Sequence, residues 1–137
     1  VDVDGLVAAI HAAAVDEQAD AVVVEGAGGL LVPVTDGVTM ADLAARLGSR
    51  LVVVTRPSLG TLNHTALTVE AARARGLDVA GLVVSGWPAE PGVTERTNLE
   101  RLEAMAPVLG LVPHIAGLDV EDPETLTPAR AASLRLL

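Results

Sequence analysis

The residues from Leu51 to Val84, LVVVTRPSLGTLNHTALTVEAARARGLDVAGLVV, decide the expected fold. Two continuous apolar runs, 51–55 and 79–84, flank a stretch at 61–75 that has helical spacing and is stopped by Gly76. Strands that are apolar throughout, and not at every second position, are typical of a parallel sheet covered by helices. This stretch therefore predicts a strand, a helix and a second strand parallel to the first.

The same alternation of strand and helix extends in both directions. Strands are also expected at 21–25 and 108–112. Further helices are expected at 3–18 with Asp4 as its cap, at 39–48 behind a capping box formed by Thr39 and Asp42, at 94–105 with Thr94 as its cap, and within 123–137. The pattern predicts one α/β domain over residues 1–137, with a parallel sheet between two helical layers.

The composition excludes several functional classes. The 137 residues carry a formal net charge of −9, with no Lys, no Cys, one Trp and no Phe or Tyr. Nucleic-acid modules that stack bases on aromatic rings are excluded, and no cluster of basic residues could bind a phosphate backbone. Disulfides and thiolate chemistry are excluded as well. No apolar run approaches the roughly 20 residues that span a bilayer. We expect a soluble, cytoplasmic protein with no nucleic-acid or membrane partner.

Unusual residues follow the ends of the expected strands. In open parallel sheets, ligands bind at the carboxyl ends of the strands. The segments at those ends are Glu25–Gly29, Arg56–Gly60, Ser85–Pro88 and Pro113–Ile115. We therefore expect a ligand site at this edge of the sheet.

Two of these segments favour binding of a charged ligand. Glu25 precedes three glycines, an arrangement that suits Mg²⁺ facing a phosphate and suits a tight turn with a solvated carboxylate equally well. The segment RPSLGTLN, 56–63, opens a helix whose free N–H groups could bind an anion, with Asn63 as a further donor. Alternatively, Ser58 or Thr61 merely caps that helix.

The remaining candidates have structural alternatives. Trp87 could stack on a nucleobase, but a lone Trp in a loop more often anchors the loop by packing. His64 is more simply a residue of the first helical turn than a base. The sequence contains no G-x-x-x-x-G-K-[ST] phosphate loop, no G-x-S-x-G elbow and no pair of metal-binding histidines.

The combination EGAGG, LGTLNHTxLT and GLxxAGLV resembles the dethiobiotin synthase family from about residue 15 to residue 116. The resemblance implies a three-layer parallel sheet of the P-loop NTPase type and a cytoplasmic homodimer whose substrate site lies at the subunit interface. It implies an ATP-dependent, Mg²⁺-requiring ligase of biotin biosynthesis. This enzyme joins 7,8-diaminononanoate and CO₂ into the ureido ring of dethiobiotin, with ADP and phosphate as further products.

The resemblance also implies roles for individual residues. Glu25 would bind Mg²⁺, and no catalytic residue is assigned within this chain. The nucleotide would contact Glu25, Gly26, Ala27, Gly28, Ser85, Gly86, Val112, Pro113 and His114. The substrate would contact Gly28, Leu59, Gly60, Thr61, Leu62 and Asn63. A ribose-contacting acidic residue would fall around Glu121 or Glu124.

The sequence departs from the family in two respects. Ser85 and Gly86 stand where the family often has an Asn-Asp pair, which leaves the base preference open. The family's phosphate loop, with its Lys, and a further Mg²⁺-binding Asp have no counterpart here. We therefore expect the chain to be the C-terminal part of such an enzyme and to be inactive alone. The alternative is a non-catalytic binding module related to MinD-like or cobyrinate-amidase-like ATPases. A MinD-like membrane helix is disfavoured, since the last expected helix carries only Arg130 and Arg135.

Overall fold

The computed structural model describes residues 1–115 of the chain. These residues form two compact units. One contains residues 1–50 and 71–78, and the other contains residues 51–70 and 79–115. The expected helix at 123–137 and the acidic residues Glu121 and Glu124 lie outside the described residues.

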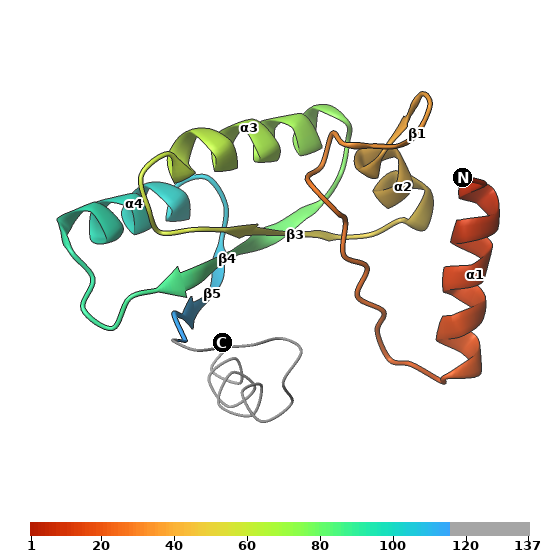
Figure 1. Cartoon of the computed structure of the whole chain (residues 1–137), viewed down its shortest axis with the longest axis horizontal. Coiled ribbons are helices and arrows are strands. Elements are labelled where there is room, and N and C mark those ends of the chain that lie inside the picture. The colour runs from red at the N-terminus through yellow and green to blue at the C-terminus, as the bar shows by residue number, and fades with distance from the viewer. Residues whose placement is uncertain (116–137) are drawn as a thin grey trace. The chain divides into compact units, whose positions relative to one another are not determined.

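The first unit contains two helices and a short hairpin (Figure 1). Helix α1 spans Val3–Asp16 and helix α2 spans Met40–Leu47. The capping box that the sequence predicts is confirmed, because Thr39 is the N-cap of α2 and exchanges hydrogen bonds with Asp42. Gly48 ends α2 in the left-handed conformation, as predicted. At α1 the expected cap is wrong, since Asp2 accepts a hydrogen bond from Gly5 N–H and Asp4 lies in the first turn.

Sequence reasoning missed the hairpin of strands β1, Pro33–Thr35, and β2, Val38–Thr39. The two strands pair antiparallel, and Gly37 lies between them with φ of +74°. An Asp-Gly dipeptide between β-branched residues is a strong signal for such a turn. The letters TDGVT at 35–39 contain that signal.

The prediction of a strand at 21–25 is wrong for residues 1–115 of the structure. Residues 21–25 have no regular secondary structure, and Val22, Val23 and Val24 are exposed. A β-strand is stabilised by hydrogen bonds to a neighbouring strand, and within residues 1–115 this segment pairs with none. High β-propensity alone therefore does not make it a strand.

The second unit is a parallel sheet with alternating helices, which confirms the predicted fold class. Its strands are β3 (Leu51–Thr55), β4 (Val79–Trp87) and β5 (Val108–Pro113). Its helices are α4 (Val93–Glu103) and α3 (Thr61–Ala74), of which the last residues, 71–74, are grouped with the first unit. The strand order is β3-β4-β5, and both neighbouring pairs are parallel.

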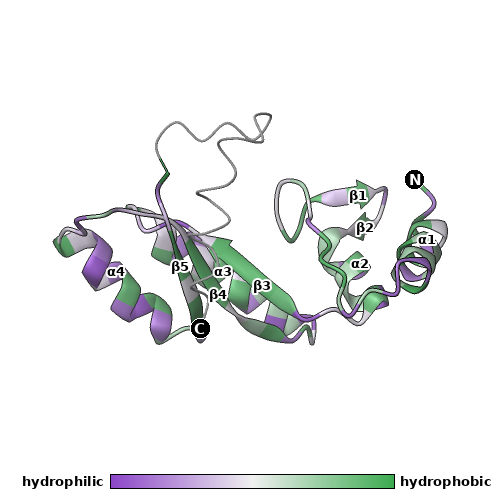
Figure 2. Ribbon diagram, turned by 90° about the horizontal axis from the view of Figure 1, so that it is seen from below, coloured by the Kyte–Doolittle hydropathy of each residue, from purple (hydrophilic) through white to green (hydrophobic). Residues whose placement is uncertain are grey.

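Both helices of this unit pack on one face of the sheet (Figure 1). The core cluster contains Leu82 and Val84 of β4, Val69 of α3, Leu102 of α4 and Ala106. The strands β3 and β4 are hydrophobic along most of their length, whereas α4 has polar and apolar sides (Figure 2). Val52 and Val54 of β3 are 50% and 67% exposed. The described part of this unit therefore shows one of the two expected helical layers.

Several element boundaries differ from the sequence prediction, among them the start of α4 and the end of β4. Helix α4 begins one residue before Thr94, and its N-cap is Gly92, whose N–H donates to the Glu95 carboxylate at 2.8 Å. Strand β4 continues to Trp87 instead of ending at Val84. Among residues 1–115, no helix is long and apolar enough to cross a membrane.

Candidate functional site

The carboxyl ends of β3, β4 and β5 meet at one edge of the second unit. Because these strands are parallel, the segment that follows β3, the end of β4, and the end of β5 with the residue after it lie at the same end of the sheet. These segments contain the predicted substrate loop at 59–63, the Ser85–Gly86 pair and the residues 112–114. The structure thus gathers three of the four predicted segments at one sheet edge.

The loop between β3 and α3 presents unoccupied backbone donors. Gly60 adopts φ of +92°, and Thr61 N–H donates to Ser58 O at 3.2 Å. The N–H groups of Leu59, Gly60, Leu62 and Asn63 have no hydrogen-bond acceptor within residues 1–115. The side chains of Leu59 and Asn63 are exposed. A helix start of this kind can bind an anion.

A buried cluster of three hydroxyl groups joins this helix start to the strand. Thr55 Oγ1 lies 2.6 Å from Thr61 Oγ1 and 2.7 Å from Thr65 Oγ1. All three threonines are buried. The Thr61 hydroxyl is therefore committed to Thr55, and its N–H to Ser58. Thr61 therefore has a structural role, although not the helix cap that the sequence left open, because its hydroxyl bonds to Thr55 and not to an N–H group of α3.

Sequence reasoning missed Asn98, which holds the same loop from α4. Its side-chain amide donates to Pro57 O at 2.8 Å and to Ser58 O at 3.4 Å, and the residue is only 8% exposed. The signal was present in the sequence, since Asn98 lies four residues before Leu102 and therefore on the same side of α4. A polar residue on the apolar stripe of a helix requires a buried partner.

The two predicted base-binding segments lie side by side. Ser85 pairs with Val112 and Trp87 with Pro113 in the register of β4 and β5. His114 N–H donates to Trp87 O at 2.8 Å. Gly86, which lies between Ser85 and Trp87, has φ of +80°. Trp87 is partly buried and packs against the core cluster, which favours its structural role as an anchor.

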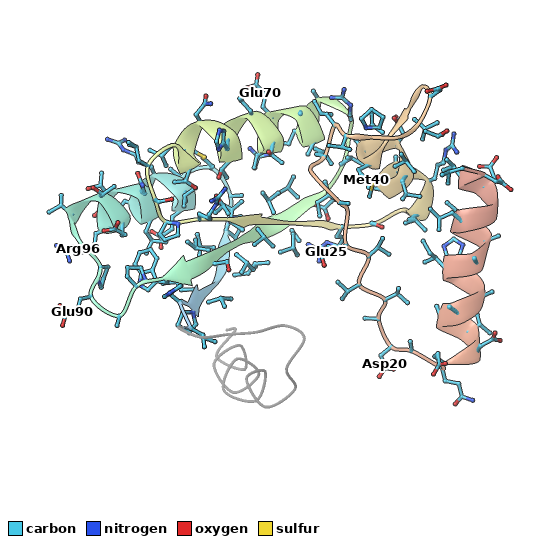
Figure 3. All side chains as sticks on the ribbon, viewed as in Figure 1. Asp20, Glu25, Met40, Glu70, Glu90 and Arg96 are labelled. Atoms are coloured by element: carbon cyan, nitrogen blue, oxygen red, sulfur yellow. The ribbon has the colours of Figure 1, made fainter. Side chains whose placement is uncertain are left out.

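Glu25 and the glycines that follow it belong to the first unit. The Glu25 side chain is exposed on the segment between α1 and β1 (Figure 3), and within the described residues it has no hydrogen bond or ion pair. A Cβ atom at Gly26 would lie 2.7 Å from Met40 Cε, and Gly28 has φ of +92°. Glycine is therefore favoured at Gly28 by its backbone conformation, whereas a Cβ atom at Gly26 would only require the flexible end of the Met40 side chain to shift.

The N–H groups at the start of α2 already donate to acceptors in the preceding segment of the chain. Met40 N–H donates to Val32 O and Ala41 N–H to Leu30 O. Hydrogen bonds from the Thr39 hydroxyl, and then from its N–H, hold the pKa of the Asp42 carboxyl below its usual value of 3.8. With these donors used, the N-terminus of α2 offers no anion site, unlike that of α3.

The acidic side chains of residues 1–115 could bind a metal ion only together with ligands from another source, such as phosphate oxygens or water. Within residues 1–115, no group of three or more His, Asp and Glu side chains could enclose a metal ion. Mg²⁺ usually binds one or two carboxylates together with phosphate oxygens and water. The exposed Glu25 carboxylate fits a site of that open kind.

Comparison with known proteins defines the class to which this architecture belongs. A family model described as "AAA domain" matches residues 1–122. The chain therefore belongs to the AAA-domain family, and the resemblance to the dethiobiotin synthases that the motifs indicate is confirmed.

Three curated relatives illustrate the similarity, and each bears the name ATP-dependent dethiobiotin synthetase BioD. The protein of Mycobacterium avium is 58% identical over 91 residues, which cover 66% of this chain and 40% of the relative. That of Mycolicibacterium smegmatis is 53% identical over 97 residues, or 71% and 42%. That of Frankia casuarinae is 50% identical over 135 residues, or 96% and 56%. The chain thus spans about half the length of the relatives it matches.

Proposed function

We propose that these residues form the C-terminal part of an ATP-dependent dethiobiotin synthase, which acts in biotin biosynthesis. One amine of 7,8-diaminononanoate takes up CO₂ as a carbamate, and the γ-phosphate of ATP is transferred to a carbamate oxygen. The second amine then attacks the carbamoyl carbon, closes the ureido ring and expels phosphate. The relatives' names support this activity, which we propose for the protein of which these residues are part.

The loop between β3 and α3 carries the proposal. The substrate has a carboxylate at the end of an aliphatic chain. The unoccupied N–H groups of Leu59, Gly60, Leu62 and Asn63, the positive end of the α3 dipole and the Asn63 amide together provide a site for that carboxylate. The Leu59 side chain is 93% exposed and is available to contact the aliphatic chain or a second subunit. We propose a homodimer in which this loop reaches the partner's active site.

The nucleotide is proposed to lie against the ends of β4 and β5. Ser85 and Gly86 are neighbours of Val112, Pro113 and His114 at that edge. This adjacency supports a shared role in contacting the base of ATP. Pro113 and His114 are both exposed residues, so the base could reach this part of the edge.

Glu25 and the segment Gly26–Gly29 are proposed to face the phosphates, with Gly28 also beside the substrate. Mg²⁺ bound there would neutralise charge that develops on the transferred phosphoryl group. Glu25 would hold the ion through one carboxylate oxygen, and the glycines would let the backbone approach the ligand closely.

The test measures steady-state kinetics of the complete protein with diaminononanoate, bicarbonate, ATP and Mg²⁺. We expect Asn63→Ala to raise the apparent KM for the diamine about tenfold, the loss that accompanies roughly 1.4 kcal/mol of binding free energy. The KM for ATP should not change.

We expect Glu25→Gln to lower kcat about a hundredfold, the scale of losing one group that stabilises transition-state charge.

Glu70→Gln is the matched control for Glu25→Gln, because Glu70 is an exposed carboxylate on α3. It should leave kcat unchanged. If Glu25→Gln also left kcat unchanged, Glu25 would not be a metal ligand. If neither KM responded to Asn63→Ala, the carboxylate site would be wrong. A wild-type protein that did not consume the diamine would overturn the proposed function.

A further inference from the structure

One buried amide determines which way the loop between β3 and α3 faces. Asn98 Nδ2 donates to two successive carbonyl oxygens, Pro57 O at 2.8 Å and Ser58 O at 3.4 Å. An amide NH₂ group has two hydrogens, so one side chain can serve both acceptors. Two neighbouring peptide groups of the loop therefore turn their oxygens toward α4.

The geometry of the peptide bond then fixes the direction of the donors. In a planar trans peptide the C=O and N–H bonds point to opposite sides of the chain. Because the Pro57 and Ser58 carbonyls face Asn98, the N–H groups of Ser58 and Leu59 face away from α4. Both residues are exposed. The contact with Asn98 thus presents successive N–H groups on the outer side of the loop.

The position of Asn98 is itself rigid. Leu102, one helical turn further along α4, is fully buried in the core cluster with Leu82 and Val84. Pro57 is also buried, and the loss of the donor would leave its carbonyl oxygen without a partner among the described residues. The hydrogen bond from Asn98 satisfies this buried oxygen, so we expect the loop to rearrange when the amide group is removed.

We propose that Asn98 is a positioning residue for the substrate carboxylate, acting through the loop at 57–60 without touching the substrate. This inference rests on the proposed function of that loop. Asn98 sets the affinity for an anionic group at the loop, whereas the nucleotide site at the ends of β4 and β5 does not depend on it.

The decisive variant is Asn98→Leu in the complete protein. Leu has nearly the same shape as Asn and suits the apolar side of α4, but it donates no hydrogen bond. We expect the KM for the diamine to rise about tenfold, with the KM for ATP unchanged. Asn98→Ala is the second variant and should give the same selective rise. Thr97→Ala, at the exposed neighbouring position, is the control and should change neither constant.

Hydrogen exchange gives a readout that does not require turnover. The N–H groups of Thr61 and His64 donate to the loop carbonyls Ser58 O and Gly60 O. Both amides should exchange faster in Asn98→Leu than in the wild type, while the amides of β4 should not change. This difference would show that Asn98 holds the loop.

The two measurements separate the possible failures. Unchanged exchange at Thr61 and His64 would overturn the positioning role. Faster exchange with equal effects on both KM values would overturn the selective link to the substrate carboxylate. A wild-type protein that is inactive on the diamine would overturn the proposed function, while the exchange measurement would still decide whether Asn98 orders the loop.

Discussion

Single residues in the glycine segment after Glu25 have different physical roles. Gly28 has φ of +92°, and a Cβ atom there would lie 2.9 Å from Val32 Cγ2. Gly29 has no atom within 4 Å of the Cβ position and no positive φ. Of these two neighbouring glycines, only Gly28 has a backbone conformation that disfavours other residues.

Gly28→Ala should therefore lower stability more than Gly29→Ala. A non-glycine residue in a left-handed conformation costs about 1–3 kcal/mol, and the contact with Val32 adds to this cost. At Gly29 we expect a change below about 0.5 kcal/mol, as for most surface substitutions. Urea unfolding of the two variants of the complete protein tests this difference. Equal losses would contradict the assignment of the strain to Gly28.

Asp42 makes a contribution to stability that depends on pH. Hydrogen bonds from Thr39 lower the pKa of its carboxyl in the folded protein from 3.8. A lowered folded-state pKa stabilises the fold above the unfolded pKa, and this contribution is lost as the pH falls through the folded pKa. We expect Asp42→Asn to be less stable than the wild type at pH 7, with the difference shrinking below pH 3.8. Unfolding midpoints at pH 7 and pH 3 measure it; a difference that grows in acid would contradict the sign.

The residues that sequence reasoning placed correctly are those fixed by local contacts. The Thr39–Asp42 capping box joins residues three positions apart and could be predicted from the letters alone. Asn98 could not be assigned in this way, because its partner Pro57 O lies 41 positions away in the sequence. Its role depends on how α4 packs on the sheet.

At the scale of elements, α3 is attached to β3 by side-chain hydroxyls as well as by apolar packing. The Thr55–Thr61–Thr65 cluster spans the end of the strand and the first two turns of the helix. Buried hydroxyls of this kind are costly unless each finds a partner. The cluster therefore couples the order of the loop to the order of both elements.

Thr65→Val should destabilise the protein by about 1–2 kcal/mol, because it deletes one buried hydrogen bond while preserving the shape of the side chain. Thr68→Val is the matched control on the same helix. The Thr68 hydroxyl bonds only to His64 O at an exposed site, so its loss should cost less than about 0.5 kcal/mol. Thermal unfolding of the two variants tests the comparison, and similar midpoints would show that the cluster contributes little.

Whether a helix or strand could be predicted depends on whether its hydrogen-bond partners are local in the sequence. Helix α3 and strands β3 and β5 appear close to the expected residues, and β4 continues past its expected end to Trp87. The three strands also pair with one another. The 21–25 segment has the letters of a strand, but a strand also requires a neighbour, which no local pattern supplies. The β1–β2 hairpin was missed although its Asp-Gly turn is visible.

At the scale of the whole chain, the proposed ATP site would need one group that these residues do not contain. The 137 residues contain no Lys, so no phosphate-loop lysine can act from this chain. Phosphoryl transfer relies on positioning and charge neutralisation. We expect the 137-residue chain by itself to release no phosphate from ATP above the buffer background, with or without the diamine. Turnover by the chain alone would contradict this division of the site.

The parallel topology explains why the location of the site could be predicted better than its details. Parallel strands place their carboxyl ends at one edge, so the segments after β3 and at the ends of β4 and β5 were expected together. The pairing of Ser85 with Val112 could not be predicted, because it depends on β4 and β5 being neighbours and on their register.

The position of Trp87 has a spectroscopic consequence. It is the one Trp of a chain without Tyr or Phe, and it ends β4 with its carbonyl bonded to His114. Ultraviolet emission from this chain therefore arises at one known point, beside the segments proposed to contact the base. We expect a ligand that enters there to shift or quench that emission, so these 137 residues carry their own fluorescent reporter for titration without any added dye.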